Sequence, residues 1–426
     1  MSRIAVVGAG YVGLTTAACF SHLGHEVVCA DIDEERIARL ARADLPIVEE
    51  GLEQLVRDGM RQGRLRFVVG AAAAVPAAEF VYLCVPTPQG GDGSVDLSFV
   101  EAVAAEIGPL VASESIVVNK STVPVGSTGV VQRVLRRPDV HVVSNPEFLR
   151  EGSAVHDFLH PERIVIGADH QAAAIRVASI YLGVAAPLIV TDPASAEIIK
   201  YASNAFLATK LSFVNAVAAI CESVGADVND VVLGMGYDER IGREFLRPGP
   251  GWGGSCLPKD TRALMRMADD AGYRFDLLRA SIDVNEQQLE RMVDKIAEAV
   301  GGALDGVTVA VWGLTFKART DDLRSSPALA VIDRLQARGA DVQAYDPTVG
   351  GALTGWDALD VRPDPYAACE GASVLAVLTE WDELRWLDFD KVAAVMSAAH
   401  VVDARNLLDR ASLIRAGFTY RGVGRR

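Results

Sequence analysis

The chain lacks the cysteine and histidine patterns of structural metal sites. Its six cysteines are scattered along 426 residues, and none belongs to a CxxC pair or a Cys/His cluster. This spacing argues against structural zinc and against a disulfide framework. We therefore expect no metal ligands and a reducing, cytoplasmic location.

Positive charge is also scarce, since 41 lysines and arginines face 56 aspartates and glutamates, for a net charge of -15. A protein of this charge repels polyanions, so nucleic acid and acidic membranes are poor partners. Any anionic ligand must then be held by local basic groups. We expect no membrane span, because the glycines in the uncharged run after Met1-Ser2-Arg3 fit a phosphate-binding turn better than a signal peptide.

The first 31 residues have the pattern of a dinucleotide-binding unit. A short apolar run at 4–7 leads into GAGYVG at 8–13, an apolar helix to about Leu23, and a second apolar run that ends at Asp31. The glycines allow a tight turn and close approach of a pyrophosphate, which the helix N-terminus attracts. Asp31 can bind ribose hydroxyls and would repel a 2′-phosphate. The pattern predicts NAD rather than NADP as cofactor, bound by Gly8, Gly10, Val12, Gly13 and Asp31.

Further apolar runs at 80–85, 116–118 and 141–144 alternate with helical stretches, as in a doubly wound parallel sheet. Ligands of such sheets lie beyond the carboxyl ends of the strands. Thr87 and Thr122 follow two of these runs in proline-containing loops and are candidate donors to the cofactor. Glu147 follows a third run. The residues alone leave open whether Glu147 is functional or lies in an ordinary helix that begins at Asn145 and Pro146.

Residues 193–225 predict one long apolar helix with an uneven distribution of polar side chains. At 100° per residue, a group of them falls in an arc of about 60°. The group contains Glu197, Lys200, Asn204, Asn215 and Glu222. So narrow a stripe favours a polar seam facing a cleft over the solvated face of an amphipathic helix, and both interpretations stay open. Lys200 and Asn204, one turn apart, are candidates to stabilise a single oxyanion.

A glycine-rich loop, PGWGGSCLPKD at 250–260, presents Cys256 with Lys259 and Asp260 shortly after it. Cysteine reacts as the thiolate, which a nearby cation and close backbone amides favour. The loop alone fits equally well a buried cysteine in a rigid turn, beside a solvated Lys–Asp ion pair. The preceding segment, 238–247, contains three arginines that either grip an anion or form a charged surface.

Gly301-Gly302-Ala303 marks a boundary, after which the alternation of strands and helices returns without GxGxxG. Lys317, Arg319 and Arg324 follow the first of these strands and suit a nucleotide or phosphate on a second ligand. The predicted fold is α/β, with two Rossmann-like, doubly wound domains joined by a long central helix and a helical middle domain. We expect domains at 1–192, 193–302 and 303–426.

Several longer motifs, in this order, resemble the UDP-glucose/GDP-mannose dehydrogenase family nearly end to end. Beside the glycine fingerprint they are CVPTP at 84–88, KSTVPVGST at 120–128, NPEFLREGSA at 145–154, KYASNAFLATK at 200–210, GGSCLPKD at 253–260 and GLTFKARTDDLRSSPAL at 313–329. The resemblance implies NAD-dependent, four-electron oxidation of the C6 alcohol of a nucleotide sugar to a carboxylate, through a cysteine thiohemiacetal and thioester. It assigns the three domains to NAD binding, to dimerisation with the catalytic cysteine loop, and to UDP-sugar binding.

The family's motif positions place the nucleophile on Cys256 and the oxyanion-stabilising pair on Lys200 and Asn204. They assign the active-site water to Asp260 and Thr122, and assistance in thioester hydrolysis to Glu147. Further implied cofactor contacts are Arg36, Thr87, Thr122, Glu151, Lys259 and Arg324. Implied substrate contacts are Glu147, Phe148, Leu149, Lys200, Asn204, Arg240, Gly253, Lys317 and Arg405. Arg240 would enter the neighbouring subunit's site in a homodimer.

Three alternatives stay open at this point. The appearance of the 313–329 stretch favours UDP-glucose over GDP-mannose as substrate, but the general motifs do not separate the two. A two-electron hydroxyacid dehydrogenase also has a Rossmann domain and a lysine on a long helix, and it would need no thiol. A catalytically silent nucleotide-sugar sensor would keep the binding motifs without turnover.

Overall fold

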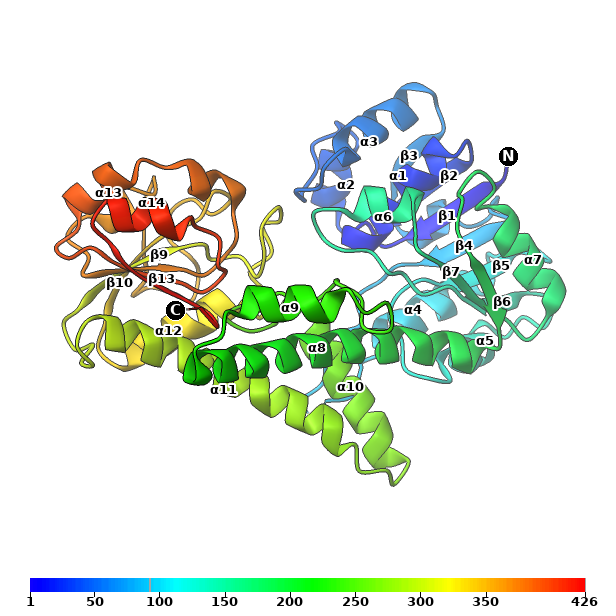
Figure 1. Ribbon diagram of the computed structural model, residues 1–426. Coiled ribbons are helices and arrows are strands. Elements are labelled where there is room, and N and C mark those ends of the chain that lie inside the picture. The colour runs from blue at the N-terminus through cyan, green and yellow to red at the C-terminus, as the bar shows by residue number, and fades with distance from the viewer. Residues whose placement is uncertain (92, 426) are drawn as a thin grey trace. The chain divides into compact units, whose positions relative to one another are not determined.

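Figure 1 shows the computed structural model, which describes residues 1–91 and 93–425. The chain divides into two compact units, Met1–Ser203 and Asn204–Arg426. Each unit contains a sheet with helices packed against it, and the long helix α8 (Pro193–Val224) is continuous through the boundary. The predicted fold class is confirmed, whereas the three domain ranges stay a prediction.

The described residues of the first unit form an eight-stranded sheet in the order β3-β2-β1-β4-β5-β6-β7-β8. The strands are β1 (Arg3–Val7), β2 (Glu26–Asp31), β3 (Leu65–Val69), β4 (Phe80–Leu83), β5 (Ile116–Asn119), β6 (His141–Ser144), β7 (Ile164–Gly167) and β8 (Leu188–Thr191). All neighbouring strands are parallel except β6 and β7. Because β2 and β4 flank β1, the order reverses at β1, where doubly wound sheets bind ligands.

Helices cover both faces of this sheet (Figure 1). They are α1 (Tyr11–His22), α2 (Glu34–Leu40), α3 (Leu52–Arg61), η1 (Ala71–Ala73), α4 (Ser98–Ile107), α5 (Ser127–Leu135), α6 (Ala154–Leu159) and α7 (Gln171–Ser179). Val6 of β1 packs into the apolar cluster that contains α1, whereas Ala5 and Val7 pack into the cluster that contains α4 and α5. Burial on both faces explains why β1 is apolar without alternation.

The described residues of the second unit repeat this strand order as β11-β10-β9-β12-β13-β14, with every pair parallel. The strands are β9 (Thr308–Trp312), β10 (Asp341–Tyr345), β11 (Asp360–Val361), β12 (Val374–Val377), β13 (His400–Asp403) and β14 (Thr419–Gly422). The remaining helices are α9 (Val228–Gly236), α10 (Leu257–Asp270), α11 (Asp276–Ala299), α12 (Pro327–Ala337), η2 (Ala367–Cys369), η3 (Asp382–Trp386), α13 (Phe389–Val395) and α14 (Arg410–Arg415). A second Rossmann-like domain is therefore confirmed.

Four of the five residues in the polar stripe of α8 are buried, and the fifth, Glu222, is half-buried and pairs with Lys295 at 2.9 Å. Glu197, Lys200, Asn204 and Asn215 are each less than a tenth exposed, and each has a hydrogen-bond partner. The interpretation as the solvated face of an amphipathic helix is therefore wrong. Among the described residues, α8 is also the one helix with the length and hydropathy of a membrane span, which is weak evidence for a span because a core helix passes the same test.

Glu197 caps the first turn of α5 from a distant part of the chain. Its carboxylate accepts hydrogen bonds from the Gly126 N–H at 2.6 Å, the Thr128 N–H at 2.9 Å and the Thr128 hydroxyl at 2.8 Å. Gly126 is the N-cap residue and has no side chain of its own to satisfy these donors. Burial raises the pKa of Glu197, and the hydrogen bonds offset only part of that rise.

We expect Glu197→Ala to lower the free energy of unfolding by about 2–4 kcal/mol, because two buried N–H groups lose their acceptor. Urea unfolding at pH 7 measures the change. Glu162→Ala is the matched control, since the Glu162 side chain is 88% exposed and its removal should change stability by less than about 0.5 kcal/mol. Equal effects of the two substitutions would contradict the capping role of Glu197.

Candidate active site

The glycine fingerprint joins β1 to α1, and close packing explains two of its glycines. Gly8 has a φ of +100°, and a Cβ there would lie 2.5 Å from the Cys84 carbonyl oxygen, just beyond β4. A Cβ on Gly13 would lie 1.8 Å from the Gly8 carbonyl oxygen. By contrast, a Cβ on Gly10 would meet no atom within 4 Å. Gly8 and Gly13 therefore shape the turn, while Gly10 leaves open space at the N-terminus of α1.

This open space fits the pyrophosphate of NAD, because α1 directs unpaired N–H groups of its first turn toward it. Asp31 ends β2 beside the turn and accepts hydrogen bonds from the N–H groups of Ala9 at 2.7 Å and Asp33 at 3.0 Å. The Arg36 guanidinium pairs with the same carboxylate at 3.2 Å. Asp31 thus lies where dinucleotide-binding domains bind the ribose, and Arg36 lies next to it. Val12, in the first turn of α1, is half-buried.

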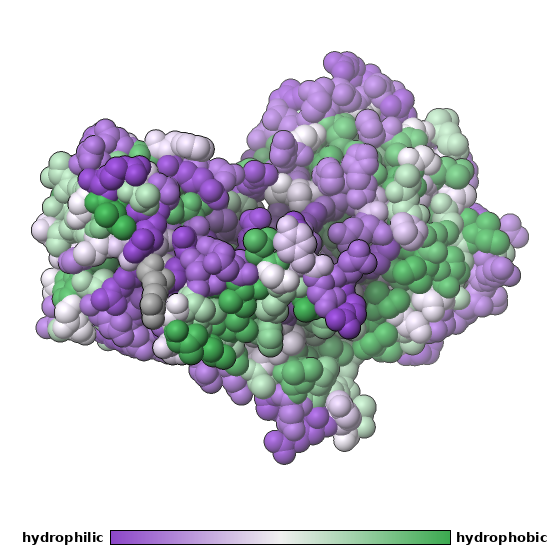
Figure 2. Space-filling view, viewed as in Figure 1, coloured by the Kyte–Doolittle hydropathy of each residue, from purple (hydrophilic) through white to green (hydrophobic). Residues whose placement is uncertain are grey.

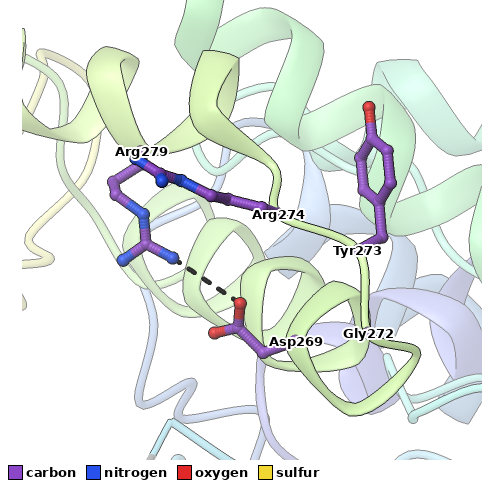
Figure 3. Close-up of a pocket in the computed structure, with 5 residues that line it drawn as sticks. All are labelled: Asp269, Gly272, Tyr273, Arg274 and Arg279. Atoms are coloured by element: carbon purple, nitrogen blue, oxygen red, sulfur yellow. Dashed lines mark ion pairs between the residues drawn. The ribbon is translucent and has the colours of Figure 1, made fainter.

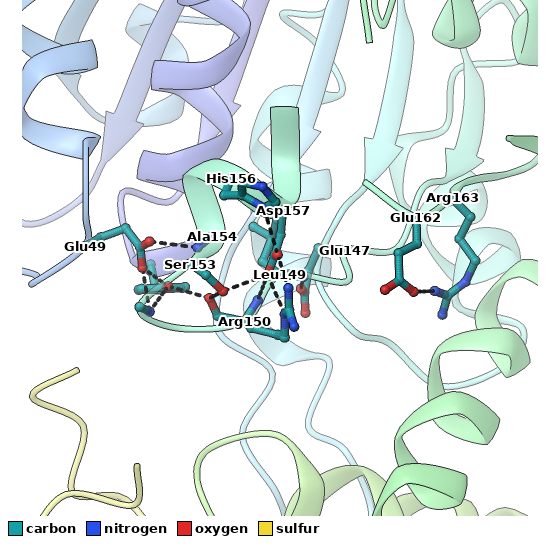
Figure 4. Close-up of polar contacts among 12 residues, drawn as sticks. Glu49, Glu147, Leu149, Arg150, Ser153, Ala154, His156, Asp157, Glu162 and Arg163 are labelled. Carbon is teal, nitrogen blue, oxygen red and sulfur yellow. Dashed lines mark hydrogen bonds and ion pairs between the residues drawn. The ribbon is translucent and has the colours of Figure 1, made fainter. Parts of the chain in front are cut away.

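Glu49, which belongs to none of the predicted motifs, ties the glycine turn to the loop that carries Glu147. Its carboxylate accepts hydrogen bonds from the Tyr11 hydroxyl and from the N–H groups of Gly152 and Ala154, both at 2.7 Å. Figure 4 shows Glu49 directed at the start of α6. Burial, reinforced by Glu49, raises the pKa of Tyr11 far above its ordinary value. No local signal marks Glu49, because its partners lie 38 to 105 residues away in sequence.

Glu147 and Lys200 form a buried ion pair, with 2.8 Å between Lys200 Nζ and Glu147 Oε1. The other carboxylate oxygen accepts the Leu149 N–H at 2.6 Å (Figure 4). Burial alone would raise the pKa of Glu147. The charge and hydrogen bond of Lys200, with a smaller contribution from Lys120, outweigh that effect and lower the pKa. Glu147 is therefore held as a carboxylate in an interior position.

The segment around Glu147 is an irregular loop. Residues 145–150 are not helical, and α6 begins only at Ala154. The alternative that Asn145 and Pro146 begin a helix is therefore wrong. Phe148 and Leu149 are half-buried, and the Arg163 guanidinium lies 3.9 Å from the centre of the Phe148 ring.

An ion pair closes the same loop. Arg150 pairs with Asp157 of α6 at 2.6 Å (Figure 4), and the next residue, Glu151, is half-buried. Thr87 and Thr122 lie in the loops after β4 and β5, both half-buried, and within the described residues their hydroxyls have no hydrogen-bond partner. Both hydroxyls are available to a ligand at the carboxyl ends of these strands.

Cys256 is the N-cap residue of α10, and its side chain is half-buried. A helix N-terminus stabilises negative charge, so this position favours the thiolate. The Ser255 hydroxyl lies 3.6 Å from the Cys256 sulfur. The interpretation as a sealed, buried cysteine is wrong. Pro258, in the first turn of α10, is the sequence signal from which the helix start was predictable.

Asp260 is fully buried beneath the thiol loop. Its carboxylate accepts hydrogen bonds from Lys259 Nζ and from Asn204 Nδ2, each at 2.6 Å. The Lys–Asp pair is therefore not the solvated pair considered as an alternative. Lys200 and Asn204 lie one turn apart on α8, and each is bonded to a carboxylate of its own: Glu147 for Lys200 and Asp260 for Asn204.

The thiol loop is in backbone contact with the loop before α12. A Cβ on Gly253 would lie 2.0 Å from the Ser325 carbonyl oxygen. Gly254 has a φ of +84°, and a Cβ there would lie 2.7 Å from the Phe316 ring. The Gly254 N–H also donates to the Ser325 carbonyl at 3.3 Å. Only glycine fits at these two positions.

The basic residues predicted for a second nucleotide gather near the carboxyl end of β9. Lys317 lies over the Phe316 ring, 5.5 Å from its centre, and Arg324 pairs with Asp322 at 2.8 Å. Arg405, which follows β13, donates to the Phe316 carbonyl oxygen at 3.1 Å and pairs with a glutamate at 3.0 Å. Lys317 and Arg405 are thus linked through one residue.

Arg240 lies on the surface, in the loop after α9, where it pairs with Asp238 at 2.6 Å. Its side chain is 89% exposed. Another arginine of this segment, Arg243, stacks on Tyr237 with 4.1 Å to the ring centre. Arg240 is therefore exposed to solvent on the surface of the second unit.

A surface hollow at the turn between α10 and α11 includes none of the predicted residues. Figure 3 shows its lining: Asp269, Gly272, Tyr273, Arg274 and Arg279. Arg279 pairs with Asp269 at 3.6 Å, and Arg274 pairs with Asp276 at 2.6 Å. Because both arginines already face carboxylates, this hollow does not present a strong anion site.

Family models match three parts of the chain. Residues 2–184 match the NAD binding domain of the UDP-glucose/GDP-mannose dehydrogenase family. Residues 194–287 match the central domain, and residues 310–410 match the UDP binding domain. These ranges together cover most of the chain.

Relatives match the chain over its whole length. It is 45% identical to the UDP-glucose 6-dehydrogenase of Rhizobium meliloti (strain 1021) over 99% of both chains. It is also 45% identical to the UDP-glucose 6-dehydrogenase TuaD of Bacillus subtilis (strain 168), over 100% of this chain and 94% of the relative. The solved structure of a UDP-glucose dehydrogenase from Pyrobaculum islandicum superposes with a TM-score of 0.92 at 38% identity, covering 100% of this chain and 98% of the other.

Gly10→Ala should weaken NAD binding at least about tenfold while changing the free energy of unfolding by less than about 1 kcal/mol. The added methyl group enters space that is open in the protein and that the pyrophosphate needs. Calorimetric titration with NAD and urea unfolding measure the two effects. Gly13→Ala is the comparison variant, because its Cβ meets the Gly8 carbonyl and should destabilise the fold itself. Unchanged NAD affinity in Gly10→Ala would contradict the role of Gly10.

Proposed function

We propose a residue-level mechanism from one premise: this chain belongs to the UDP-glucose/GDP-mannose dehydrogenase family and is an NAD-dependent oxidoreductase. It oxidises the C6 alcohol of UDP-glucose to a carboxylate. Full-length similarity to relatives named UDP-glucose 6-dehydrogenase supports this substrate. The observation that carries the chemistry is a half-buried thiol at the N-terminus of α10, with the buried Asn204–Asp260 pair in the same unit.

The overall change removes two hydrides and three protons from the alcohol and one water. NAD, when bound, would supply the hydride acceptor for both oxidation steps. The glycine turn and Asp31 hold the dinucleotide, with Arg36 on the adenosine side. Thr87 and Thr122 would donate to it from the strand ends, and Glu151, Lys259 and Arg324 are proposed to complete its contacts.

Lys200 and Asn204 stabilise the oxyanions that form at C6. The first is the alkoxide left when the alcohol loses its proton. The Cys256 thiolate then attacks the aldehyde carbon, and the thiohemiacetal so formed loses the second hydride to become a thioester. Cationic and amide donors that are fixed before the reaction stabilise such charge without reorganisation.

Two buried carboxylates serve the water that ends the reaction. Asp260 orders or deprotonates the water with Thr122, and Glu147 assists its attack on the thioester. The attack expels the Cys256 thiolate and gives the acid. Because Asn204 is bonded to Asp260 and Lys200 to Glu147, each oxyanion donor lies beside a group that can accept a proton.

The nucleotide of the substrate is held by basic side chains of the second Rossmann-like domain. Lys317 and Arg405 are the proposed contacts, and both neighbour Phe316. Gly253 is proposed to let the substrate approach the thiol loop closely, and Phe148 and Leu149 to line the sugar. None of the six cysteines is in a disulfide within the described chain, which supports a reducing, cytoplasmic location.

The proposed functional form is a homodimer built on α8. Four large apolar side chains of α8 are more than half exposed: Phe206, Phe213, Ile220 and Val224. By helical periodicity they fall in an arc of about 40°, opposite the buried polar seam. Figure 2 shows hydrophobic surface over the region of α8 and α9. A partner subunit that covers this stripe would bring its exposed Arg240 into the neighbouring site.

Wild-type protein should release two NADH per UDP-glucose at limiting substrate, together with an acidic product. Cys256→Ser should still bind NAD and UDP-glucose but lose acid formation by at least about a thousandfold, because a serine hydroxyl does not supply the thiolate. NADH absorbance and anion-exchange analysis of the product measure both.

Matched assays separate the alternatives. Activity with GDP-mannose alone would change the substrate, and one NADH per sugar with active Cys256→Ser would indicate the two-electron dehydrogenase. No NADH from either sugar would support the sensor. The variant Ser255→Ala controls for disturbance of the loop, since it removes only the hydroxyl beside the thiol.

Phe213→Asp should weaken self-association at least about tenfold, because it places a charge in the middle of an apolar stripe. Sedimentation equilibrium measures the dimer dissociation constant. Trp386→Asp is the control, since Trp386 is exposed on η3, outside this stripe. A dimer that is equally tight in both variants would show that α8 is not the interface.

A further inference from the structure

A buried lysine near Glu147 has no role in the mechanism above. Lys120 directly follows β5 and is 5% exposed. Its Nζ lies 3.2 Å from Asn145 Oδ1 and 3.2 Å from the Tyr181 hydroxyl, and 5.8 Å from the ring centres of Phe158 and Tyr181. Within residues 1–91 and 93–425 it forms no ion pair with a carboxylate. An ammonium without a counter-charge is costly to bury, so its charge needs another explanation.

The carboxylate that this charge acts on is Glu147. Within the first unit, the titratable groups that act on Glu147 include Lys200, bonded at 2.8 Å, Lys120 at longer range, and the Cys84 thiol. Both lysines lower the pKa of Glu147, against the effect of burial. Lys120 thus adds positive charge near the Glu147–Lys200 pair without donating a hydrogen bond to the Glu147 carboxylate.

Lys120 also fixes the loop that carries Glu147. Asn145 lies two residues before Glu147, and its Oδ1 accepts from both Lys120 and the Tyr181 hydroxyl, the latter at 2.5 Å. The Asn145 Nδ2 donates to the Val165 carbonyl on β7 at 2.8 Å. Asn145, the first residue after β6, therefore anchors the loop through hydrogen bonds made inside the protein.

We propose that Lys120 is a positioning residue that keeps Glu147 ionised while Lys200 stabilises the substrate oxyanion. The inference rests on the proposed function. When an anion develops near Lys200, the positive charge of Lys200 is shared between that anion and Glu147. A buried carboxylate that loses part of its counter-charge takes up a proton more readily. Because Lys120 forms no ion pair with a carboxylate in the described chain, its charge offsets the counter-charge that Glu147 loses.

Lys120→Met tests this role because it removes the charge and keeps an unbranched side chain of similar length. Loss of the cation raises the pKa of Glu147. On acidification, the activity of the variant should therefore begin to fall at a higher pH than that of the wild type. We expect the acid limb of the kcat profile to move up by about 1 pH unit, with KM values for UDP-glucose and NAD within about twofold of wild type. Lys120→Arg, which keeps the charge, should restore the wild-type profile.

Tyr181→Phe is the matched control, because it removes a hydrogen bond to Lys120 and Asn145 without changing charge. Its acid limb should stay in place even if stability falls. An unshifted limb in folded Lys120→Met, or the same shift in Tyr181→Phe, overturns the inference.

If Lys120→Met does not fold, the near-isosteric Asn145→Asp places a carboxylate on the lysine instead and should move the limb in the same direction. An unshifted limb there likewise overturns the inference. Failure of the inference is distinguishable from failure of the proposed function. A wild type that produces no NADH contradicts the function, whereas an active wild type with unshifted variants contradicts only the role of Lys120.

Discussion

Many of the buried polar groups of this protein depend on hydrogen bonds to the polar stripe of one helix, α8. α8 rises about 1.5 Å per residue, and along its buried stripe it bonds in turn the start of α5, the Glu147 loop, the carboxylate beneath the thiol loop and the N–H of Gly249. These partners come from distant parts of the sequence. The helical backbone between Lys200 and Asn204 holds these two predicted oxyanion donors one turn apart.

The parts of the fold that were predictable are those fixed by local rules. The apolar runs and the glycine turn indicated β1, α1 and β2 with ends within about two residues. A Cβ at Gly8 or Gly13 would clash with backbone atoms, so glycine at these two positions directly indicates the tight turn between β1 and α1. Four strands of the second sheet, β9, β10, β12 and β13, were likewise predictable from apolar runs separated by helical patterns, whereas β11 and β14 are short and polar and gave no such signal. The narrow arc of polar residues on α8 predicted a polar seam facing a cleft, and its departure from a solvated face is what the burial of Glu197, Lys200, Asn204 and Asn215 bears out.

The parts that were not predictable depend on contacts between distant segments. Asn145 and Pro146 have the local preferences of a helix start, yet the hydrogen bonds of Asn145 to Lys120 and Val165 hold this segment as a loop. Glu49 belongs to no motif, and only the folded chain brings it to Tyr11 and the start of α6. The pairing of Lys200 with one carboxylate and Asn204 with another follows from tertiary structure as well. Helical spacing placed the two side chains together but gave no information on their partners.

The contact between Gly253 and Ser325 constrains how this enzyme can change over evolution or by design. A Cβ on Gly253 would come within 2.0 Å of the Ser325 oxygen, so neither segment has room for an independent insertion or a larger residue. A backbone shift at Ser325 would therefore displace Gly253, which lies three residues before Cys256 in the thiol loop. Under the proposed function, changes of Lys317 or Arg324 toward another nucleotide would preserve the proposed nucleophile only where they leave this backbone contact intact.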